Sequence, residues 1–335
     1  MSNDCIVLVT KDRPAKLLKT IQHLNVSEMN VIILDDSTSQ ITKDMVLAQT
    51  FKNKRLIYHG TNEQNKLLKK LKPLNLNTFL KPLGSRGWNL GFARNYALIL
   101  SKALRCDKLL FMDDDIIIQD MTIKKTMLMK LDYCDFVGAK LIGMPDDSVT
   151  GHLMRACGGQ YYEFLSGGFL AINVHAVTEY FFNCYNEDQI WFFLHHPSTK
   201  FERFGEVEHQ QYNPFRNASA TALSQEFGEI LDDGAEEAFN RRDSNLLISP
   251  DFWEEMCNIR INYLNQLPEL SIGKEIEYTA QNVYKALMNY HSKISYNTFV
   301  DLFLRYFKHR EKWRDALNSL EACHLEYLEA KLCQI

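Results

Sequence analysis

The chain has 335 residues, of which 46% are hydrophobic and 24% are charged, an ordinary balance for a protein with a sizeable buried core. Its net charge of −4 argues against a protein whose whole surface binds nucleic acid. No stretch approaches the roughly 20 consecutive apolar residues that span a bilayer, which disfavours an integral membrane protein.

Apolar runs and helical spacing alternate through the first third of the chain. Continuous apolar runs predict strands at residues 5–9, 31–34, 56–58 and 108–112. Apolar residues at helical spacing predict helices over 13–24 and 91–103. Residues 60–89 are polar and basic, and predict a long loop with one short helix. Strands that are apolar on both faces and alternate with helices predict an α/β fold, with a mainly parallel sheet flanked by helices.

The pattern changes toward the C-terminus. Residues 135–242 are mixed, with strands expected at 136–137 and 169–172. Ser249 suits an N-cap with Pro250 at the first helical position, and Tyr, Phe and Leu then recur at helical spacing. We expect about four helices there.

These patterns predict a domain organisation. The α/β domain spans residues 1–245, with halves of about 1–120 and 121–245, and an α-helical region spans 246–335. The aromatic-rich helices of that region make a homodimer a reasonable expectation.

The cysteines and the first residues bear on the cellular compartment. The eight cysteines are scattered without a C-x-x-C pair, which favours reduced, mostly buried thiols over a disulfide or zinc framework. No basic region precedes an apolar one at the start, so no signal peptide is expected. Together these features predict a cytoplasmic protein.

One segment concentrates positive charge. Residues 52–86 contain a single acid, Glu63, and nine basic residues: Lys52, Lys54, Arg55, Lys66, Lys69, Lys70, Lys72, Lys81 and Arg86. Such a run is typical of a solvated loop. The alternative hypothesis is a patch that holds a polyanionic acceptor, such as nucleic acid, or an anionic surface.

Polar residues follow three of the predicted strands: 10–13, 35–36 and 113–115. Ligands of parallel α/β sheets bind at the carboxyl ends of the strands, so these residues indicate a site there. The carboxylates of Asp113, Asp114 and Asp115 repel one another, and a divalent cation such as Mg²⁺ or Mn²⁺ would neutralise them. A solvated acidic turn is the alternative for the triplet taken alone.

Four motifs in this order resemble those of GT-A fold glycosyltransferases, close to the family 2 type. Residues 9–14 (VTKDRP) and 34–38 (LDDST) resemble the two nucleotide-binding loops of that family. Residues 113–115 (DDD) resemble its D-x-D metal motif, and residues 89–95 (NLGFARN) its G-x-A-R-N helix start. The resemblance covers about residues 5–120. It implies a GT-A (Rossmann-like) fold, a nucleotide-diphosphate sugar as donor and a bound Mn²⁺ or Mg²⁺.

The resemblance also implies roles for residues of the first half. Asp35 or Asp36 would accept hydrogen bonds from the base or ribose. The forked guanidinium groups of Arg13 and Arg94 suit phosphate oxygens, although Arg94 is alternatively an exposed helix arginine. Thr10 and Asn95 belong to the same donor-binding motifs, while Asp113 would face the ribose or the metal and Asp115 the metal.

The second half resembles the family less closely. Gly167 and Gly168 resemble the glycine-rich segment approached by donor and acceptor sugars, or alternatively form a turn before a strand. Glu187 and Asp188 resemble the E-D motif whose acid serves as general base, and Asp188 is the first choice. The alternative is an acidic pair that favours a helix start.

Histidines offer a further ligand. His209 lies where related enzymes carry a third metal ligand or a diphosphate contact, with His195 and His196 as rivals. Residues 225–229 resemble a segment that follows the E-D motif in some bacterial members, without an assignable chemistry.

The leading hypothesis is therefore a metal-dependent glycosyltransferase (hexosyl- or pentosyltransferase) of the inverting class that acts on an acceptor hydroxyl. Saccharides, proteins or peptides and modified nucleic-acid bases remain open as acceptors. A sugar-phosphate nucleotidyltransferase is disfavoured because residues 10–14 replace the G-x-G-x-R loop of that class. A non-catalytic scaffold that binds nucleotide sugars is disfavoured because both acidic motifs are present.

Overall fold

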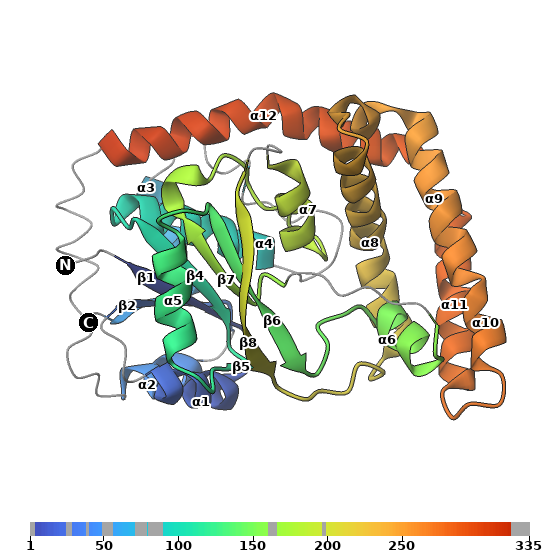
Figure 1. Ribbon diagram of the computed structural model, residues 1–335, viewed down its shortest axis with the longest axis horizontal. Coiled ribbons are helices and arrows are strands. Elements are labelled where there is room, and N and C mark those ends of the chain that lie inside the picture. Colours follow the sequence, from blue (N-terminus) through green and yellow to red (C-terminus); the bar gives the residue numbers. More distant parts are fainter. Residues whose placement is uncertain are drawn as a thin grey trace.

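The computed structural model describes residues 4–24, 29–37, 40–48, 56–70, 79, 90–159, 166–195 and 199–322. Its centre is an eight-stranded mixed sheet in the order β3-β2-β1-β4-β7-β6-β8-β5. Helices cover both faces of the sheet, and further helices extend beyond one end of it (Figure 1). The α/β fold and the helical C-terminal region predicted from the sequence are confirmed.

The first half of the sheet is parallel, as predicted. β1 pairs in parallel with β2 and β4, and β2 pairs in parallel with β3. The strands of this half are β1 (Cys5–Thr10), β2 (Asn30–Asp35), β3 (Leu56–His59) and β4 (Lys108–Asp113). The helices between them are α1 (Pro14–Leu24), α2 (Ile41–Leu47), α3 (Thr61–Lys70) and α4 (Leu90–Ala103).

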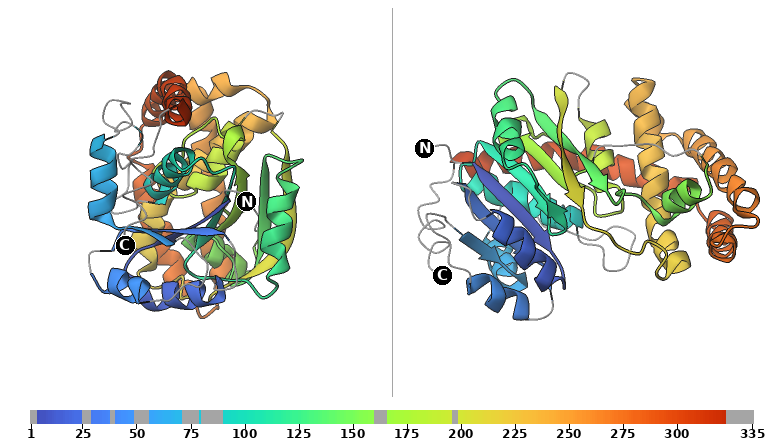
Figure 2. Two further views of the ribbon diagram at one scale, coloured as in Figure 1. Left: turned by 90° about the vertical axis from the view of Figure 1, so that its left-hand side faces the viewer. Right: turned by 60° about the horizontal axis from the view of Figure 1, so that its bottom comes forward.

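Alternating side chains of β1 pack into two separate hydrophobic cores. Val7 packs in the cluster that contains α4, and Ile6 and Leu8 pack in the cluster that contains α1. Figure 2 shows α1 and α2 on one side of the parallel strands and α4 on the other. Burial on both faces explains why these strands read as uninterrupted apolar runs.

The second half of the sheet is mixed. β7 runs antiparallel to both β4 and β6, while β8 pairs in parallel with β6 and antiparallel with β5. The strands are β5 (Ile116–Ile117), β6 (Phe136–Gly143), β7 (Phe169–Asn173) and β8 (Phe201–His209). The helices are α5 (Thr122–Lys130), α6 (Val149–Ala156), the 3-10 helix η3 (Val174–Ala176), α7 (Glu187–Leu194) and α8 (Ala218–Asn240).

Helices make up the described chain from Ser244 onward. They are η4 (Ser244–Ile248), α9 (Pro250–Leu264), α10 (Gln266–Ser271), α11 (Glu277–His291) and α12 (Tyr296–Ala322). Ser249 caps α9 as predicted, because its side chain accepts a hydrogen bond from the backbone N–H of Phe252. Long α12 runs along one side of the α/β part (Figure 1).

The helical region shares its core with the sheet. Trp253 and Tyr306 of the helical region belong to the same buried cluster as Phe111 of β4 and Trp191 of α7. The predicted boundary between residues 245 and 246 stays a prediction, and so does the homodimer. In the ranges that the structure describes, no helix is long and apolar enough to cross a membrane.

The prediction that the thiols are all reduced is wrong for one pair. Cys5 and Cys106 form a disulfide, with their Cα atoms 6.5 Å apart. The pairing follows from the sheet: Cys5 starts β1, and Cys106 lies just before the neighbouring parallel strand β4. Cys134, Cys157, Cys184 and Cys257 are free, and Cys323 and Cys333 lie outside the described residues.

Most of the basic residues of segment 52–86 lie outside the described ranges. Lys52, Lys54, Arg55, Lys72, Lys81 and Arg86 lie outside the described residues. Lys66, Lys69 and Lys70 belong to α3, and Glu63 on the same helix pairs with Lys43 at 3.1 Å. The role of segment 52–86 in holding a polyanionic acceptor therefore stays a hypothesis.

Candidate active site

The carboxyl ends of β1, β2 and β4 bring the three predicted polar clusters to one edge of the sheet. Thr10 lies opposite Asp35 in the parallel register, and Val9 lies opposite Asp113. The convergence expected from parallel strands is therefore present.

Asp114 of the acidic triplet points back into the protein. Its side chain is fully buried, and it accepts a hydrogen bond of 2.6 Å from the Thr10 hydroxyl. The Arg13 guanidinium forms ion pairs with Asp114 at 2.9 Å and with Asp115 at 2.8 Å. Burial raises the pKa of Asp114 to about 7 against the pull of Arg13. Thr10 and Arg13 thus hold the acidic loop in place by binding Asp114. The resemblance to the metal motif did not reveal this structural role of Asp114.

The two aspartates after β2 have different surroundings. Asp35 is 1% exposed and accepts hydrogen bonds from the Tyr58 hydroxyl, at 2.6 Å, and the Ser37 backbone N–H, at 2.8 Å. Burial and this bond to Asp35 raise the pKa of Tyr58. Asp36 keeps 29% of its side chain exposed and pairs with Lys11 at 2.9 Å. Asp36 is therefore the more accessible carboxylate for a nucleoside.

Asp115 and His209 meet at the end of the sheet. His209 Nε2 lies 3.6 Å from an Asp115 oxygen, and its Nδ1 donates to the Met144 carbonyl at 3.0 Å. Burial alone would raise the pKa of Asp115, but His209, Arg13 and Lys16 lower it below its ordinary value. Burial likewise opposes charge on His209, yet its carboxylate neighbours raise the pKa of that ring. Of the rival histidines, His195 follows the C-terminal end of α7, at the opposite end of that helix from Glu187 and Asp188. His196 is outside the described residues.

The acidic edge fits a divalent cation held jointly with phosphate oxygens. Asp113 is 26% exposed at its side chain, and burial together with the charges of Asp115 and Asp146 raises its pKa to about 6 despite Arg94. A cation would relieve this repulsion between carboxylates. No three metal-ligating side chains form a ready-made cage within the described ranges. Mg²⁺ characteristically takes one or two protein carboxylates and completes its shell with phosphates and water.

Arg94 is buried between three acids and is not an exposed helix arginine. Its side chain is 2% exposed, with Nη1 3.0 Å from Glu187 and 3.6 Å from Asp188, and Nη2 4.0 Å from Asp113. The rings of Phe111 and Phe181 lie 5.8 and 5.7 Å from its guanidinium carbon. The resemblance implied a phosphate contact, but this geometry makes Arg94 an internal counter-charge that links the two acidic motifs.

Gly167 and Gly168 connect the same two motifs through the backbone. The Gly167 N–H donates to Asp188 at 2.5 Å, and the Asp113 N–H donates to the Gly168 carbonyl at 2.9 Å. A Cβ on Gly167 would lie 2.0 Å from Arg94 Nη1, which is far inside contact distance. The glycine at position 167 is therefore required by the close approach of the guanidinium.

Asn95 does not reach the donor side. It is 0% exposed, and its amide nitrogen donates to the carbonyls of Phe79, at 3.1 Å, and Phe181, at 2.7 Å. Its amide oxygen accepts from the Phe181 N–H at 2.7 Å. Because the side chain is buried and both of its N–H groups bind backbone carbonyls, we drop Asn95 as a donor contact and assign it a structural role.

Helix α8 positions the turn that precedes Asp188. Asn186, in the left-handed region at φ 57°, donates to Glu229 at 3.2 Å and to Asp232 at 2.9 Å. A Cβ on Gly228 would lie 2.2 Å from the Tyr185 carbonyl oxygen, so α8 approaches this turn closely. Residues 225–229, which had no assignable chemistry from sequence, thus support the start of α7.

Asp146 is a site residue that the sequence analysis missed. It accepts a hydrogen bond of 2.5 Å from Ser166, whose hydroxyl also accepts from the Gly168 N–H at 2.9 Å. Desolvation raises its pKa, and Asp188 and Asp115 add to this effect as like charges. The only sequence signal was an Asp-Asp pair before the N-cap Ser148 of α6.

Comparisons with known proteins give distant structural likenesses. No protein-family model and no curated protein matches the chain. The solved structures that resemble it include a mannosyltransferase from Pyrobaculum calidifontis in complex with GDP-Man and Mn²⁺, at 12% identity, covering 98% of this chain and 88% of that one, with a TM-score of 0.43. A putative nucleotide-diphospho-sugar transferase from Desulfovibrio desulfuricans G20 matches at 11% identity, covering 69% and 97%, with a TM-score of 0.35. Mouse xyloside xylosyltransferase 1 matches at 12% identity, covering 56% and 72%, with a TM-score of 0.34. Likenesses this distant carry no function to the chain, so the function proposed below depends on its own residues.

Proposed function

We propose that the protein transfers a sugar from a nucleotide-diphosphate sugar to an acceptor hydroxyl, with inversion at the sugar carbon. The observation that carries the proposal is the backbone link between the two acidic motifs. Gly168 binds Asp113 on the donor side, and the adjacent Gly167 binds Asp188. This short segment holds the carboxylates proposed to bind a cation close to Asp188, whose side chain is 13% exposed. Transfer between adjacent donor and acceptor sites requires such proximity.

Donor binding is assigned to the ends of β1, β2 and β4. Asp36 would accept hydrogen bonds from the nucleoside, and Arg13, with 44% of its side chain exposed, would contact phosphate oxygens. Asp113 and Asp115 would hold Mn²⁺ or Mg²⁺ together with phosphate oxygens, and His209 lies beside Asp115, with its Nε2 3.6 Å from that carboxylate. When bound, such a cation stabilises the negative charge that develops on a departing nucleoside diphosphate.

Asp188 is assigned as the general base that takes the proton of the acceptor hydroxyl. Its side chain is 13% exposed, and the Gly167 N–H and Arg94 fix its orientation. Burial and the charge of Asp188 raise the pKa of Glu187 to about 8 in spite of Arg94. Glu187 is only 3% exposed and lies closer to Arg94 than Asp188 does, so we assign Glu187 to holding Arg94 and the more exposed Asp188 to proton transfer.

A thermal-stabilisation screen tests donor binding first. Nucleotide sugars of each base are added with and without Mn²⁺, and we expect at least one to raise the melting temperature only when Mn²⁺ is present. Asp115→Ala should abolish that rise, whereas Asp120→Ala, an exposed aspartate five residues further along, should not. A stabilisation that survives chelation and Asp115→Ala would disprove the metal assignment.

Product analysis then separates the three classes. A glycosyltransferase releases nucleoside diphosphate, with slow donor hydrolysis when no acceptor is present. A nucleotidyltransferase instead forms nucleoside triphosphate from nucleotide sugar and pyrophosphate. Donor binding without either product, over panels of saccharide, peptide and nucleic-acid acceptors, would favour the non-catalytic scaffold.

A further inference from the structure

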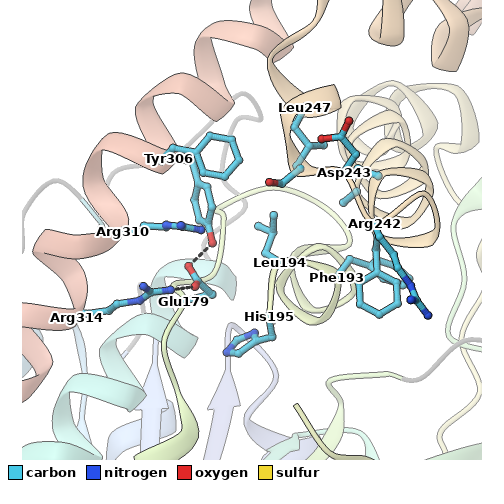
Figure 3. A pocket seen from close by; sticks show the side chains of 15 residues that line it. Glu179, Phe193, Leu194, His195, Arg242, Asp243, Leu247, Tyr306, Arg310 and Arg314 are labelled. Atoms are coloured by element: carbon cyan, nitrogen blue, oxygen red, sulfur yellow. Dashed lines mark hydrogen bonds and ion pairs between the residues drawn. The ribbon is translucent and has the colours of Figure 1, made fainter. Parts of the chain in front are cut away.

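A cavity of about 360 Å³ lies at the end of α7 opposite to Asp188. The ends of α7 and α8, together with η4 and α12, form its walls (Figure 3). Much of the lining is apolar and aromatic, including Phe193, Leu194, Phe239, Leu247 and Phe307. This size and lining are those of a small-molecule site. None of its lining residues belongs to the donor and acceptor residues assigned above.

Helix α12 contributes three polar side chains at four-residue spacing, so that they share one face: Tyr306, Arg310 and Arg314. Tyr306 and Arg314 both bind the carboxylate of Glu179, which is 1% exposed (Figure 3). The Glu179 charge is thereby compensated inside the protein.

Arg310 is left as an uncompensated cation at this wall. Its guanidinium lies 5.4 Å from the ring of Phe307, and no carboxylate pairs with it among the described residues. The second acid of the lining, Asp243, is exposed and accepts two hydrogen bonds of 3.0 Å from Asn245. Arg242, Arg310 and Arg314 outnumber Glu179 and Asp243, so the cavity favours an anion.

His195 adds an unused hydrogen-bond acceptor. The ring is 3% exposed, and its Nδ1 lies 2.7 Å from the Trp191 carbonyl, which can only accept. Nδ1 therefore carries the proton, and Nε2 presents a lone pair. Within the described part of the chain this buried Nε2 has no hydrogen-bond partner. Burial lowers the pKa of His195 to about 4, in keeping with a neutral ring. A ligand that donates a hydrogen bond would satisfy this atom.

We propose that this cavity binds a small organic anion whose apolar body carries a hydroxyl or N–H group. Arg310 binds the anionic group, the aromatic side chains contact the body, and His195 Nε2 accepts the hydrogen bond. The site is separate from the proposed donor and acceptor sites, and it goes beyond the proposed transfer reaction. Because Phe193 and Leu194 end the same helix that Glu187 and Asp188 begin, an occupant contacts the helix that carries the proposed base.

Three matched probes test the proposal by calorimetry on the full chain without nucleotide sugar. 4-Hydroxybenzoate has the anion, the apolar ring and the donor, 4-hydroxybenzamide lacks the charge, and benzoate lacks the hydroxyl. We expect saturable binding of 4-hydroxybenzoate and binding about tenfold weaker for each of the other two, because each lacks one hydrogen bond to a charged or buried group.

Two variants and a control locate the binding. Arg310→Gln should weaken 4-hydroxybenzoate binding about tenfold and leave 4-hydroxybenzamide binding unchanged. Arg305→Gln is the control, since Arg305 is exposed on the same helix and does not line the cavity. Ala235→Leu should block all three probes by filling the space. Absence of saturable binding, equal affinities for the anion and the amide, or equal effects of the two arginine variants would overturn the proposal.

Discussion

Substituting Gly167 by alanine tests whether Arg94 and the two acidic motifs form one rigid unit. The added Cβ would lie 2.0 Å from Nη1 and 2.7 Å from Cζ of Arg94. The guanidinium has little room to move, because it is 2% exposed and lies against the rings of Phe111 and Phe181. Either the turn shifts and breaks the bond from the Gly167 N–H to Asp188, or Arg94 leaves its carboxylates.

The magnitude follows from these two possibilities. Overpacking costs about 1–3 kcal/mol, and separating a buried ion pair costs about 3–5 kcal/mol. We expect Gly167→Ala to lower the free energy of unfolding by about 3 kcal/mol. Gly168→Ala is the matched control: its Cβ would lie 3.1 Å from the Ser166 hydroxyl and 3.2 Å from an Asp113 oxygen, both ends of side chains. It should cost below about 1 kcal/mol.

Urea denaturation of the two variants measures the difference directly, provided that their m-values agree. Equal losses of stability for Gly167→Ala and Gly168→Ala would refute the reasoning. So would a stable Gly167→Ala protein that retains the full rate of transfer.

Three further predictions concern residues around this unit. Asn95→Leu should lower the free energy of unfolding, measured by urea denaturation, by about 3 kcal/mol, because it leaves buried backbone groups of Phe79 and Phe181 without partners. The donor affinity of the folded protein should stay unchanged. Weaker donor binding would restore Asn95 as a donor contact. Gly228→Ala should lower kcat and leave the donor Kd unchanged, because the added Cβ would clash with the Tyr185 carbonyl in the turn before Asp188. A changed Kd at constant kcat would contradict this positioning role. Glu226→Gln should cost about 3 kcal/mol at pH 7, because burial opposes the charge but Arg260 and His291 lower the Glu226 pKa from 4.5 to about 2. A depressed carboxyl pKa stabilises the fold above pH 4.5 and loses that effect as pH falls toward 2, so the difference between variant and wild type should shrink over this range; a difference independent of pH would disprove the linkage.

The sequence predicted the parallel half of the sheet because each of its strands is buried on both faces. Continuous apolar runs such as 5–9 and 31–34 have no other common explanation when helical segments alternate with them, and their carboxyl ends had to meet at one edge. The antiparallel direction of β7 was not predictable, since it depends on pairing with β4 and β6 over long separations.

The roles of Arg94, Asn95 and Asp146 depended on tertiary contacts. Arg94 and Asn95 are neighbours on α4 and face different partners: Arg94 faces acids from β4 and α7, and Asn95 faces backbone groups. No local pattern distinguishes a buried counter-charge from a phosphate ligand. Asp146 precedes a helix, where acids are common for local reasons alone, so its neighbours Ser166 and Asp188 become visible only in the fold.

The rate of sugar transfer by Asp188→Asn, with donor affinity measured on the same protein, tests the central claim most directly. Asparagine keeps the size of the side chain and an oxygen for the Gly167 N–H, but cannot take up the acceptor's proton. The structure predicts an unchanged donor Kd and a rate lower by about 10²–10⁴-fold. A variant that transfers sugar at the wild-type rate would contradict the assignment of Asp188 and with it the proposed active site.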